Sequence, residues 1–349
     1  MKNCKFLPLI ISIIFTCLSC SRNTDEYNAP VFKKNIKVTL ETLNDNFSFT
    51  YGSIDCIDTL VIISNETPLN NNTFHLFSAN SGKYIMSFGA SGRGPGETLF
   101  PSPAFSVDYW NKEIYVYDTP QQKIIRYSLP NVINGNHFYY SEMKIPVDAG
   151  KIMMQKFFFL KKNKYLWALN RFILGNSSGI ISVYDSYPRL NEPEEYKKLE
   201  RSYFNQMGNL GVSPDKSKFV HVTTNGCIME TFSCGNDTIK PLSINRLFKP
   251  EYTCSNKTPN YPILSPTAEA ICGIRRVACT DNYIYANYSD VPQETSNKIY
   301  AVFDWDCKPI RTLSFNDKIS RMTILPGDKV GFALAEREDG TVYLARFEL

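Results

Sequence analysis

The stretch "PAFSVDYWNKEIYVYDTPQQKIIRYSL" (residues 103–129) predicts three short β-strands joined by two tight turns. The strands are 103–110, 113–118 and 123–129, each rich in Ile, Val, Tyr or Phe, and the breaks between them contain Asn, Thr and Pro. Such runs, bounded by turn-forming residues, are typical of antiparallel strands. "FYYSEMKI" (138–145) supplies a fourth strand. The stretch therefore predicts one four-stranded antiparallel sheet, with 103–110 innermost.

Units of similar composition recur along the whole chain. Their central aromatic residues are separated by 40 to 71 residues, and the longer gaps leave room for insertions. A repeated unit of about 40–50 residues with four strands has the size of a propeller blade. The expected fold is therefore all-β, a six-bladed β-propeller with four-stranded antiparallel blades. Each blade is marked by one recurring segment, and the six segments are 75–83, 115–123, 182–190, 229–237, 301–309 and 343–349.

A ring of blades has to close, because open sheet edges invite aggregation. We expect an early strand, in 36–43 or in 58–64, to join the C-terminal strands within 328–349. The Asp339-Gly340 pair is a strong hairpin signal between those last strands. One segment departs from the strand pattern: 191–207 is rich in Glu and Lys with helical spacing of its apolar residues, which predicts one short helical insertion.

The glycine-rich stretch "SFGASGRGPGETLFP" (87–101) raises the question of phosphate binding. A phosphate loop must open a helix, so that the helix N-terminal amides face the anion. Here an extended, proline-containing stretch follows, and no Lys-Ser or Lys-Thr pair is present. We therefore interpret the stretch as the crossover from the outer strand 84–89 of one blade to the inner strand of the next.

Two interpretations of this crossover stay open. In the structural one, the glycines permit a tight path and Arg93 pairs with Glu97. In the functional one, Arg93, Gly94, Gly96 and Glu97 lie at the mouth of the central channel and contact an anionic or carboxylate ligand.

Three further arginines are predicted near the channel. Residues 274–279 are expected to form an inner strand, so that Arg275 or Arg276 points toward the hub, and Arg321 occupies a comparable place one blade later. An arginine near the axis is costly unless it is paired or hydrated. These side chains either line one mouth of the channel with Arg93 and attract an acidic ligand, or form salt bridges between blades.

The N-terminus has the layout of a secretory signal. Lys2 and Lys5 precede an apolar run that is too short to span a membrane, and "LSC" ends it before Ser21. "LSC" looks like a bacterial lipobox with Cys20 as the lipidated residue. We expect a signal peptide over 1–19, a lipidated N-terminus and polar tether over 20–32, and a single propeller domain over 33–349. Ordinary cleavage near Ser19 is the alternative.

Two stretches resemble known propeller repeats. Residues 77–129 look like the NHL-type repeat, which runs from a Gly-rich crossover through a proline to an inner strand and then to a strand like "YVYD". "GVSPDKSKFVHVT" (211–223) is similar to the Ser-Pro-Asp unit of TolB-type propellers, but has Lys216 where glycine is usual. With the lipobox, these motifs resemble the TolB-like six-bladed propeller lipoproteins of Gram-negative bacteria. That resemblance implies a ring at the cell envelope and supplies no catalytic residues.

Composition and cysteines limit the possible functions. The net charge of +4 falls to +2 without the leader, so no electrostatic footprint for nucleic acid is expected. Seven cysteines lie beyond Cys20, at spacings that match no zinc site, and we predict no metal and no cofactor. A Cys227–Cys234 disulfide across a short hairpin is possible in an oxidising compartment, and buried free thiols are the alternative.

These observations favour a binding or protein-interaction module at the cell envelope, anchored by lipid to the outer membrane. Its partner is expected to be a glycan, a peptide or an envelope protein. A propeller enzyme acting on a polysaccharide or a lactone is a second hypothesis, although no catalytic residue stands out. A structural scaffold with no small ligand is a third.

Overall fold

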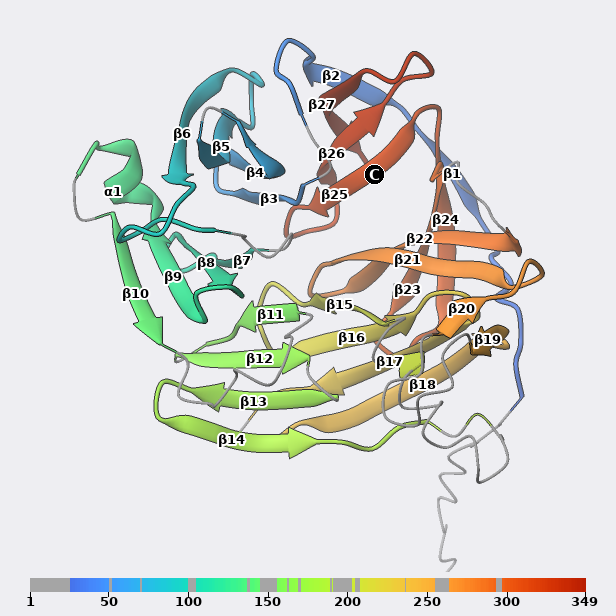
Figure 1. Ribbon diagram of the computed structural model, residues 1–349. Helices are drawn as coiled ribbons and strands as arrows, with labels where there is room; N and C mark the ends of the chain where they lie inside the picture. The colour runs from blue at the N-terminus through green and yellow to red at the C-terminus, as the bar shows by residue number, and fades with distance from the viewer. Residues whose placement is uncertain are drawn as a thin grey trace, which may run out of the picture.

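The computed structural model arranges the chain as six small sheets around a common axis (Figure 1), which confirms the predicted six-bladed β-propeller with four-stranded antiparallel blades. The structure describes residues 26–49, 52–69, 71–99, 105–136, 139–144, 156–161, 163–168, 171–188, 190, 203–204, 208–235, 237–254, 264–292 and 297–349.

Each blade runs outward from the strand nearest the axis. Blade one contains β3 (Ile54–Ile57), β4 (Leu60–Leu69), β5 (Asn72–Ser78) and β6 (Tyr84–Ala90). Blade two contains β7 (Ser106–Asp108), β8 (Glu113–Asp118), β9 (Lys123–Ser128) and β10 (Tyr140–Lys144). Blade three contains β11 (Lys156–Phe159), β12 (Lys164–Ala168), β13 (Phe172–Asn176) and β14 (Gly179–Tyr184).

The other three blades follow the same order. Blade four contains β15 (Gly208–Val212), β16 (Lys218–Thr223), β17 (Cys227–Ser233) and β18 (Lys240–Phe248). Blade five contains β21 (Ile271–Cys279), β22 (Tyr283–Pro292), β23 (Ile299–Asp304) and β24 (Pro309–Phe315). Blade six contains β25 (Lys318–Ile324), β26 (Val330–Glu336), β27 (Val342–Glu348) and β2 (Leu40–Asn44). A small hairpin of β19 (Tyr252–Cys254) and β20 (Leu264–Pro266) lies between blades four and five in sequence.

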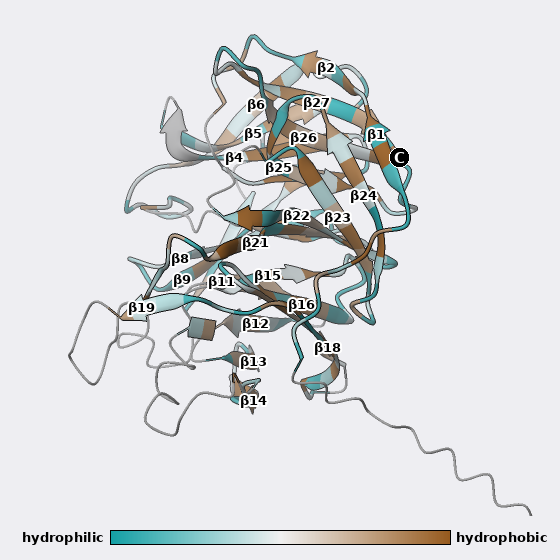
Figure 2. Cartoon of the chain, turned by 90° about the vertical axis from the view of Figure 1, so that its right-hand side faces the viewer, coloured by the Kyte–Doolittle hydropathy of each residue, from teal (hydrophilic) through white to brown (hydrophobic). Residues whose placement is uncertain are grey.

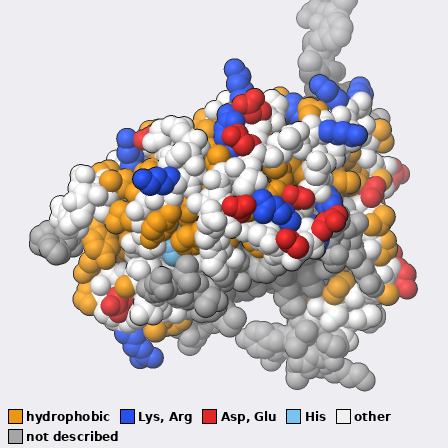
Figure 3. All heavy atoms as spheres, turned by 90° about the horizontal axis from the view of Figure 1, so that it is seen from above, with side chains coloured by type: hydrophobic (Ala, Val, Ile, Leu, Met, Phe, Trp, Pro, Cys, Tyr) orange, Lys and Arg blue, Asp and Glu red, His pale blue; other side chains and the backbone are white. Residues whose placement is uncertain are grey.

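The ring closes through the N-terminal strand β2, which pairs antiparallel with β27 and places Leu40 opposite Phe347. Of the strand proposed for closure over 36–43, the residues from Leu40 onward therefore join the C-terminal strands, whereas the alternative, 58–64, belongs to β4 of blade one. Ion pairs support the junction, with Arg346 and Glu41 joined at 3.3 Å. Figure 3, which looks onto this side of the molecule, shows acidic and basic side chains interspersed.

The chain before β2 also packs on the ring. β1 (Asn35–Val38) pairs parallel with β24, the outer strand of blade five. The Phe32 ring lies edge-on to Phe303 at 5.7 Å, and the Asn28 amide donates to the Arg246 carbonyl at 2.9 Å. The second half of the predicted tether (20–32) therefore lies against blades four and five, whereas the predicted signal peptide and Cys20 lie outside the described residues.

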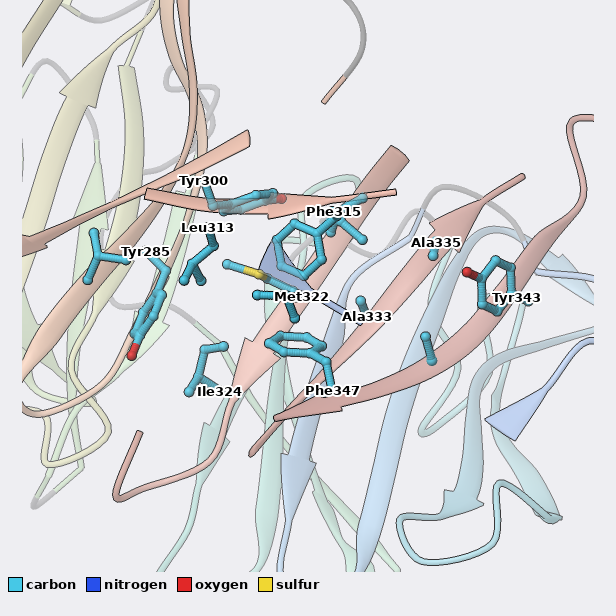
Figure 4. Packing of buried hydrophobic residues seen from close by; sticks show 14 residues of the cluster. Tyr285, Tyr300, Leu313, Phe315, Met322, Ile324, Ala333, Ala335, Tyr343 and Phe347 are labelled. Carbon is cyan, nitrogen blue, oxygen red and sulfur yellow. The ribbon is translucent and has the colours of Figure 1, made fainter. Parts of the chain in front are cut away.

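Neighbouring blades bury apolar side chains against each other at all six interfaces. Along β8, Ile114 and Val116 pack against blade one, and Tyr115 and Tyr117 pack against blade three. Successive side chains of a strand point to opposite faces, so a central blade strand must be apolar on both. Figure 2 shows brown, hydrophobic stretches along strands such as β22 and β25, beside white and teal ones. Figure 4 shows the core between blades five and six, where Met322 meets Phe315 and Phe347.

Helix is scarce in the described part of the chain. α1 (Leu129–Ile133) lies between β9 and β10 of blade two and begins with Pro130 in its first turn, where a missing N–H leaves no bond unmade. The helix predicted over 191–207 lies outside the described residues, except for Tyr203 and Phe204, which have helical backbone. None of the described helices is long and apolar enough to cross a membrane.

Candidate functional site

The glycine-rich crossover connects β6 to β7, as predicted, and it is fastened to blade two. The Gly96 amide donates to Glu142 Oε1 at 2.6 Å, and the same oxygen accepts from Lys123 Nζ at 2.8 Å. Gly96 itself has φ +70°, and a β-carbon there would lie 2.7 Å from the Tyr140 ring. Glycine is therefore needed at this position for both conformation and space.

Glu97 has a structural role within the loop. Its carboxylate folds back and accepts from the Gly94 amide at 2.7 Å. A β-carbon at Gly92 would lie 2.0 Å from this carboxylate, and one at Gly94 would lie 2.9 Å from it. Two of the four glycines thus make room for one acidic side chain. The expected ion pair between Arg93 and Glu97 is not formed, and Arg93 is exposed without an ion pair to any described residue.

The arginines of blades five and six do converge. β21 and β25 are innermost strands, as predicted, and Arg276 and Arg321 both donate to the Ser320 carbonyl, the second at 2.9 Å. The ladder between β25 and β26 shifts register between Ile319 and Arg321, a bulge that leaves the intervening carbonyl outside the regular pairing. Two guanidinium groups therefore share one backbone acceptor near the axis.

The remaining predicted site residues do not join this pair. Arg275 lies at a register shift of β21 and donates to Cys272 Sγ at 3.0 Å, back along its own strand. Arg93, Gly94, Gly96 and Glu97 belong to a loop held over the middle and outer strands of blade two. Of the predicted cluster, the structure brings together Arg276 and Arg321.

A second polar group on the axis was not predicted. The Tyr109 hydroxyl lies 3.0 Å from both carboxylate oxygens of Asp55, and Thr323 Oγ1 donates to Asp55 Oδ1 at 3.1 Å. These residues come from the inner strands, or the first turns, of blades two, one and six. Lys216, in the β15–β16 turn of blade four, places Nζ 5.3 Å from the centre of the Tyr109 ring. We call Asp55, Tyr109, Lys216 and Thr323 the axial cluster.

The axial cluster lies toward one face of the ring, which we call the turn face. This face carries the turns between the first and second strands of the blades, and both Tyr109 and Lys216 belong to such turns. The glycine-rich loop passes over the opposite, crossover face. Arg321 precedes Thr323 by two residues on β25 and so lies about one pleat, roughly 6–7 Å, farther from the turn face.

Burial perturbs the charged members of the axial cluster in opposite directions. It raises the pKa of Asp55 above its ordinary value, against the effect of the Cys56 amide and of Lys216. It lowers the pKa of Lys216 to about 8, although Asp55 and Asp108 act in the other direction. Loss of water around a charge disfavours the charged form of either group.

One sequence signal pointed to this cluster. Lys216 occupies the position where the similar Ser-Pro-Asp units carry glycine, and the structure shows why glycine is usual, since Lys216 has φ +59°. A lysine at this position has an unfavourable backbone conformation, and the residue as a whole is 7% exposed. The other members of the cluster have no comparable signal, because they come from separate blades.

Of the two alternatives for Cys227 and Cys234, the structure shows buried free thiols and not the possible disulfide. Cys227 begins strand β17, and Cys234 follows its last residue, so the two lie at opposite ends of one extended segment instead of facing each other across a hairpin. A disulfide requires Cα atoms within about 7 Å. Both thiols are free and buried, like most of the seven described cysteines, of which Cys254 is exposed.

A buried ion pair joins blades three and four. Arg171 Nη2 lies 2.7 and 2.8 Å from the two carboxylate oxygens of Glu230, and His221 Nδ1 lies 3.4 Å from Glu230 Oε2. Burial acts to raise the pKa of Glu230, but Arg171 and His221 together hold it below its ordinary value. Because the pair lies between two packed sheets, we interpret it as a link between blades.

Two other findings concern possible sites. A pocket of about 310 Å³ lies between blades one and two, lined by apolar residues and by the Asp58–Lys112 ion pair. Its other lining residues are Ile57, Thr59, Leu60, Leu129, Pro130, Ile133 and Asn134. Within the described ranges, no three His, Cys, Asp or Glu side chains are grouped closely enough to hold a metal ion.

Comparisons with known proteins agree with the fold. A family model of the TolB-like 6-blade propeller-like type matches residues 31–325. A solved Bacteroides fragilis protein, described as exported, aligns with a TM-score of 0.57 at 14% identity, over 90% of this chain and 98% of its own. The solved structure of U3-55K aligns with a TM-score of 0.50 at 8% identity, over 89% and 98%. No curated protein matches the sequence.

Proposed function

Because the chain belongs to the TolB-like six-bladed propeller family, we propose that it is an exported binding module of the cell envelope, tethered by lipid at Cys20, with a ligand site on the propeller axis. Membership of the family supports an interaction role, since a propeller is a rigid ring in which side chains from the inner strands of all blades meet at the axis. The likeness to a protein described as exported supports the location.

One observation carries the binding proposal: charged side chains from several blades converge on the axis of the ring. Removing a charge from water is unfavourable unless it is paired. Asp55, Lys216, Arg276 and Arg321 nevertheless occupy inner strands or turns, which favours a role in recognition over a role in packing.

Arg276 and Arg321 suit an acidic ligand. Guanidinium groups present planar sets of donors that match a carboxylate in bidentate geometry. Two of them meeting at the Ser320 carbonyl create a concentrated positive field near the axis. A sugar acid or an acidic peptide entering along the axis is therefore the ligand class that we propose for this part of the site.

Calorimetric titration with oligogalacturonate and with an acidic peptide tests this proposal. Arg276→Ala and Arg321→Ala should each weaken binding of the responsive probe at least about tenfold, since a charge-assisted hydrogen bond contributes roughly 1.5–3 kcal/mol. Arg93→Ala is the matched control, because that arginine is exposed on the blade-two loop, and it should leave affinity within about twofold. Equal responses of all three variants would contradict a site at the axial arginines.

The tether is tested separately. Cys20→Ala should abolish incorporation of radiolabelled palmitate and move the protein from the membrane fraction to the soluble fraction. Labelling that survives this substitution would overturn the assignment of the anchor.

A scaffold without a small ligand is the second candidate. The axial contacts of Asp55 with Tyr109 and Thr323 join three blades, and such a link stabilises the ring whether or not a ligand binds. The titrations distinguish the two, because a scaffold binds neither probe.

A further inference from the structure

Lys216 differs from its counterparts in the other first turns of the blades. Non-glycine residues with left-handed backbone recur at this place in five blades, with φ between 52° and 59°. In blades one, two and three the side chain is exposed, and Asp58 and Lys112 pair with each other at 2.7 Å. In blade four the side chain instead enters the ring and is 7% exposed. The five residues are Asp58, Lys112, Asn163, Lys216 and Asp328.

The Lys216 ammonium lacks the partners that a buried charge ordinarily has. Nζ lies over the Tyr109 ring, but it forms no hydrogen bond and no ion pair within 4.0 Å to any described residue. Its three N–H donors are thus available, while the residue is more than nine-tenths buried. Burying an ammonium without a partner is unfavourable, and the left-handed backbone of Lys216 adds strain.

The surroundings of Lys216 determine which ligand fits. Asp55 and Asp108 are the carboxylates that act on it most strongly. The Asp108 oxygens accept from the Trp110 and Asn111 amides and from the Asn111 side chain. An anionic ligand would face two carboxylates, and a cationic one would face the ammonium. A neutral group with an oxygen acceptor avoids both conflicts.

Hydroxyl groups satisfy this environment best, because one hydroxyl accepts from an ammonium and donates to a carboxylate or phenol oxygen. Asp55, Tyr109 and Thr323 offer such oxygens on the side of the axis toward blades one, two and six. Trp110, next to Tyr109 in sequence, is 54% exposed, and Lys161 Nζ lies 4.3 Å from the centre of its ring, so that the uncovered part of the ring supplies an aromatic surface on the turn face. A few convergent polar groups beside an aromatic surface are typical of small-molecule sites.

We propose that the turn-face end of the axis is a second ligand site, in which Lys216 Nζ donates to a hydroxyl of a neutral saccharide and the axial cluster holds the neighbouring hydroxyls. This inference rests on the proposed binding function and deepens it. The pair of Arg276 and Arg321 lies farther along the axis. The two proposed sites therefore differ in the ligand that they bind, which is neutral at the axial cluster and acidic at the arginine pair.

The test uses the mature protein on an array of neutral and acidic oligosaccharides, followed by calorimetry with each saccharide that binds. Lys216→Gly removes the ammonium and also suits the left-handed backbone, so the variant keeps its fold. Lys112→Gly is the matched control, because Lys112 has the same turn position and left-handed backbone as Lys216 but an exposed side chain. The expected result is that a neutral saccharide binds, that Lys216→Gly weakens it at least about tenfold, and that Lys112→Gly stays within about twofold.

Three results would overturn the inference. The first is that no neutral saccharide of the array binds. The second is that Lys216→Gly and Lys112→Gly affect a neutral saccharide equally while both melt cooperatively like the wild type. The third is that only acidic saccharides bind, and that Arg276→Ala weakens their binding whereas Lys216→Gly does not. This result would support the proposed binding function and exclude the second site.

Discussion

The Tyr109 phenol oxygen lies 3.0 Å from both carboxylate oxygens of Asp55, and these two residues join blades one and two on the axis. Removing this hydroxyl leaves a desolvated carboxylate with one donor fewer. We expect Tyr109→Phe to lower the free energy of unfolding by about 1–3 kcal/mol in urea titrations. Tyr117→Phe is the control, since this tyrosine is also buried but its hydroxyl bonds no described residue, and the change should alter stability by less than about 0.5 kcal/mol. Equal losses of stability in the two variants would show that the hydrogen bond from Tyr109 to Asp55 does not contribute to the free energy of unfolding.

Lys216 should make stability depend on pH in the alkaline range. Its folded pKa of about 8 lies below the value of about 10.4 for an unfolded lysine. Below pH 8 the ammonium is charged in both states, so the cost of its burial is fully present. Between these two values the unfolded state binds more protons, and the contribution of Lys216 to stability therefore rises with pH.

The comparison that isolates this effect is wild type against Lys216→Gly, in urea at pH 7.5, 9 and 10. Any stability advantage of the variant should shrink as pH rises, because the wild-type penalty disappears. The nearby groups, Asp55, Asp108, Tyr109, Cys234 and Asp215, remain in both proteins and largely cancel. A difference that is constant with pH would mean that Lys216 keeps an ordinary pKa.

The Arg171–Glu230 pair links blades three and four from within the core. Arg171→Met leaves a buried, uncompensated carboxylate and should destabilise the protein by about 3–5 kcal/mol. The double variant Arg171→Met/Glu230→Met should recover most of that loss, because neither charge then remains. In wild type, the depressed pKa of Glu230 gives stability that is present above the unfolded value and is lost as pH falls through the folded one. A double variant no more stable than the single one would argue against this account of the pair.

Closure of the ring depends on β2. A protein that begins at Asp45 lacks the strand that covers β27, and we expect aggregation and loss of a cooperative thermal transition, because a long sheet edge is exposed. A protein that begins at Glu26 retains β1 and β2 and should melt like the mature protein. Size-exclusion chromatography and circular dichroism measure both outcomes. A stable monomer that begins at Asp45 would show that three strands suffice for blade six.

The described cysteines should all react as thiols once the protein is unfolded without reductant, including Cys227 and Cys234. In the native protein at pH 7.5, maleimide should modify Cys254 rapidly and Cys234 slowly, because burial raises the pKa of Cys234 to about 12. Mass spectrometry of the labelled peptides decides this. A Cys227–Cys234 peptide recovered two mass units light would contradict the strand assignment of β17.

The blade repeat was predictable because turn-forming residues mark the strand ends. The predicted strand 113–118 coincides with β8 (Glu113–Asp118), and β6 and β7 flank the glycine-rich crossover as expected. Helix α1 was missed, since five residues carry no periodicity. The parallel pairing of β1 with β24 was missed because nothing local encodes a contact across the ring.

The candidate site was harder to predict for the same reason. Thr323 and Asp55 are 268 residues apart and meet only because the ring closes. The inner-strand arginines were found from the blade template, which fixes the strand but not the bulges that turn Arg275 away from Arg276. The structural interpretation of the crossover paired Glu97 with Arg93, but the space left by Gly92 and Gly94 lets the Glu97 carboxylate reach a backbone amide instead.

Hydrogen–deuterium exchange locates the ligand on the propeller, using whichever saccharide or acidic peptide binds in the titrations. Binding on the axis should slow exchange in β3, β21 and β25 and in the β15–β16 turn, and should leave the outer strands β10, β14 and β18 unchanged. Protection confined to those outer strands or to the glycine-rich crossover would contradict an axial site.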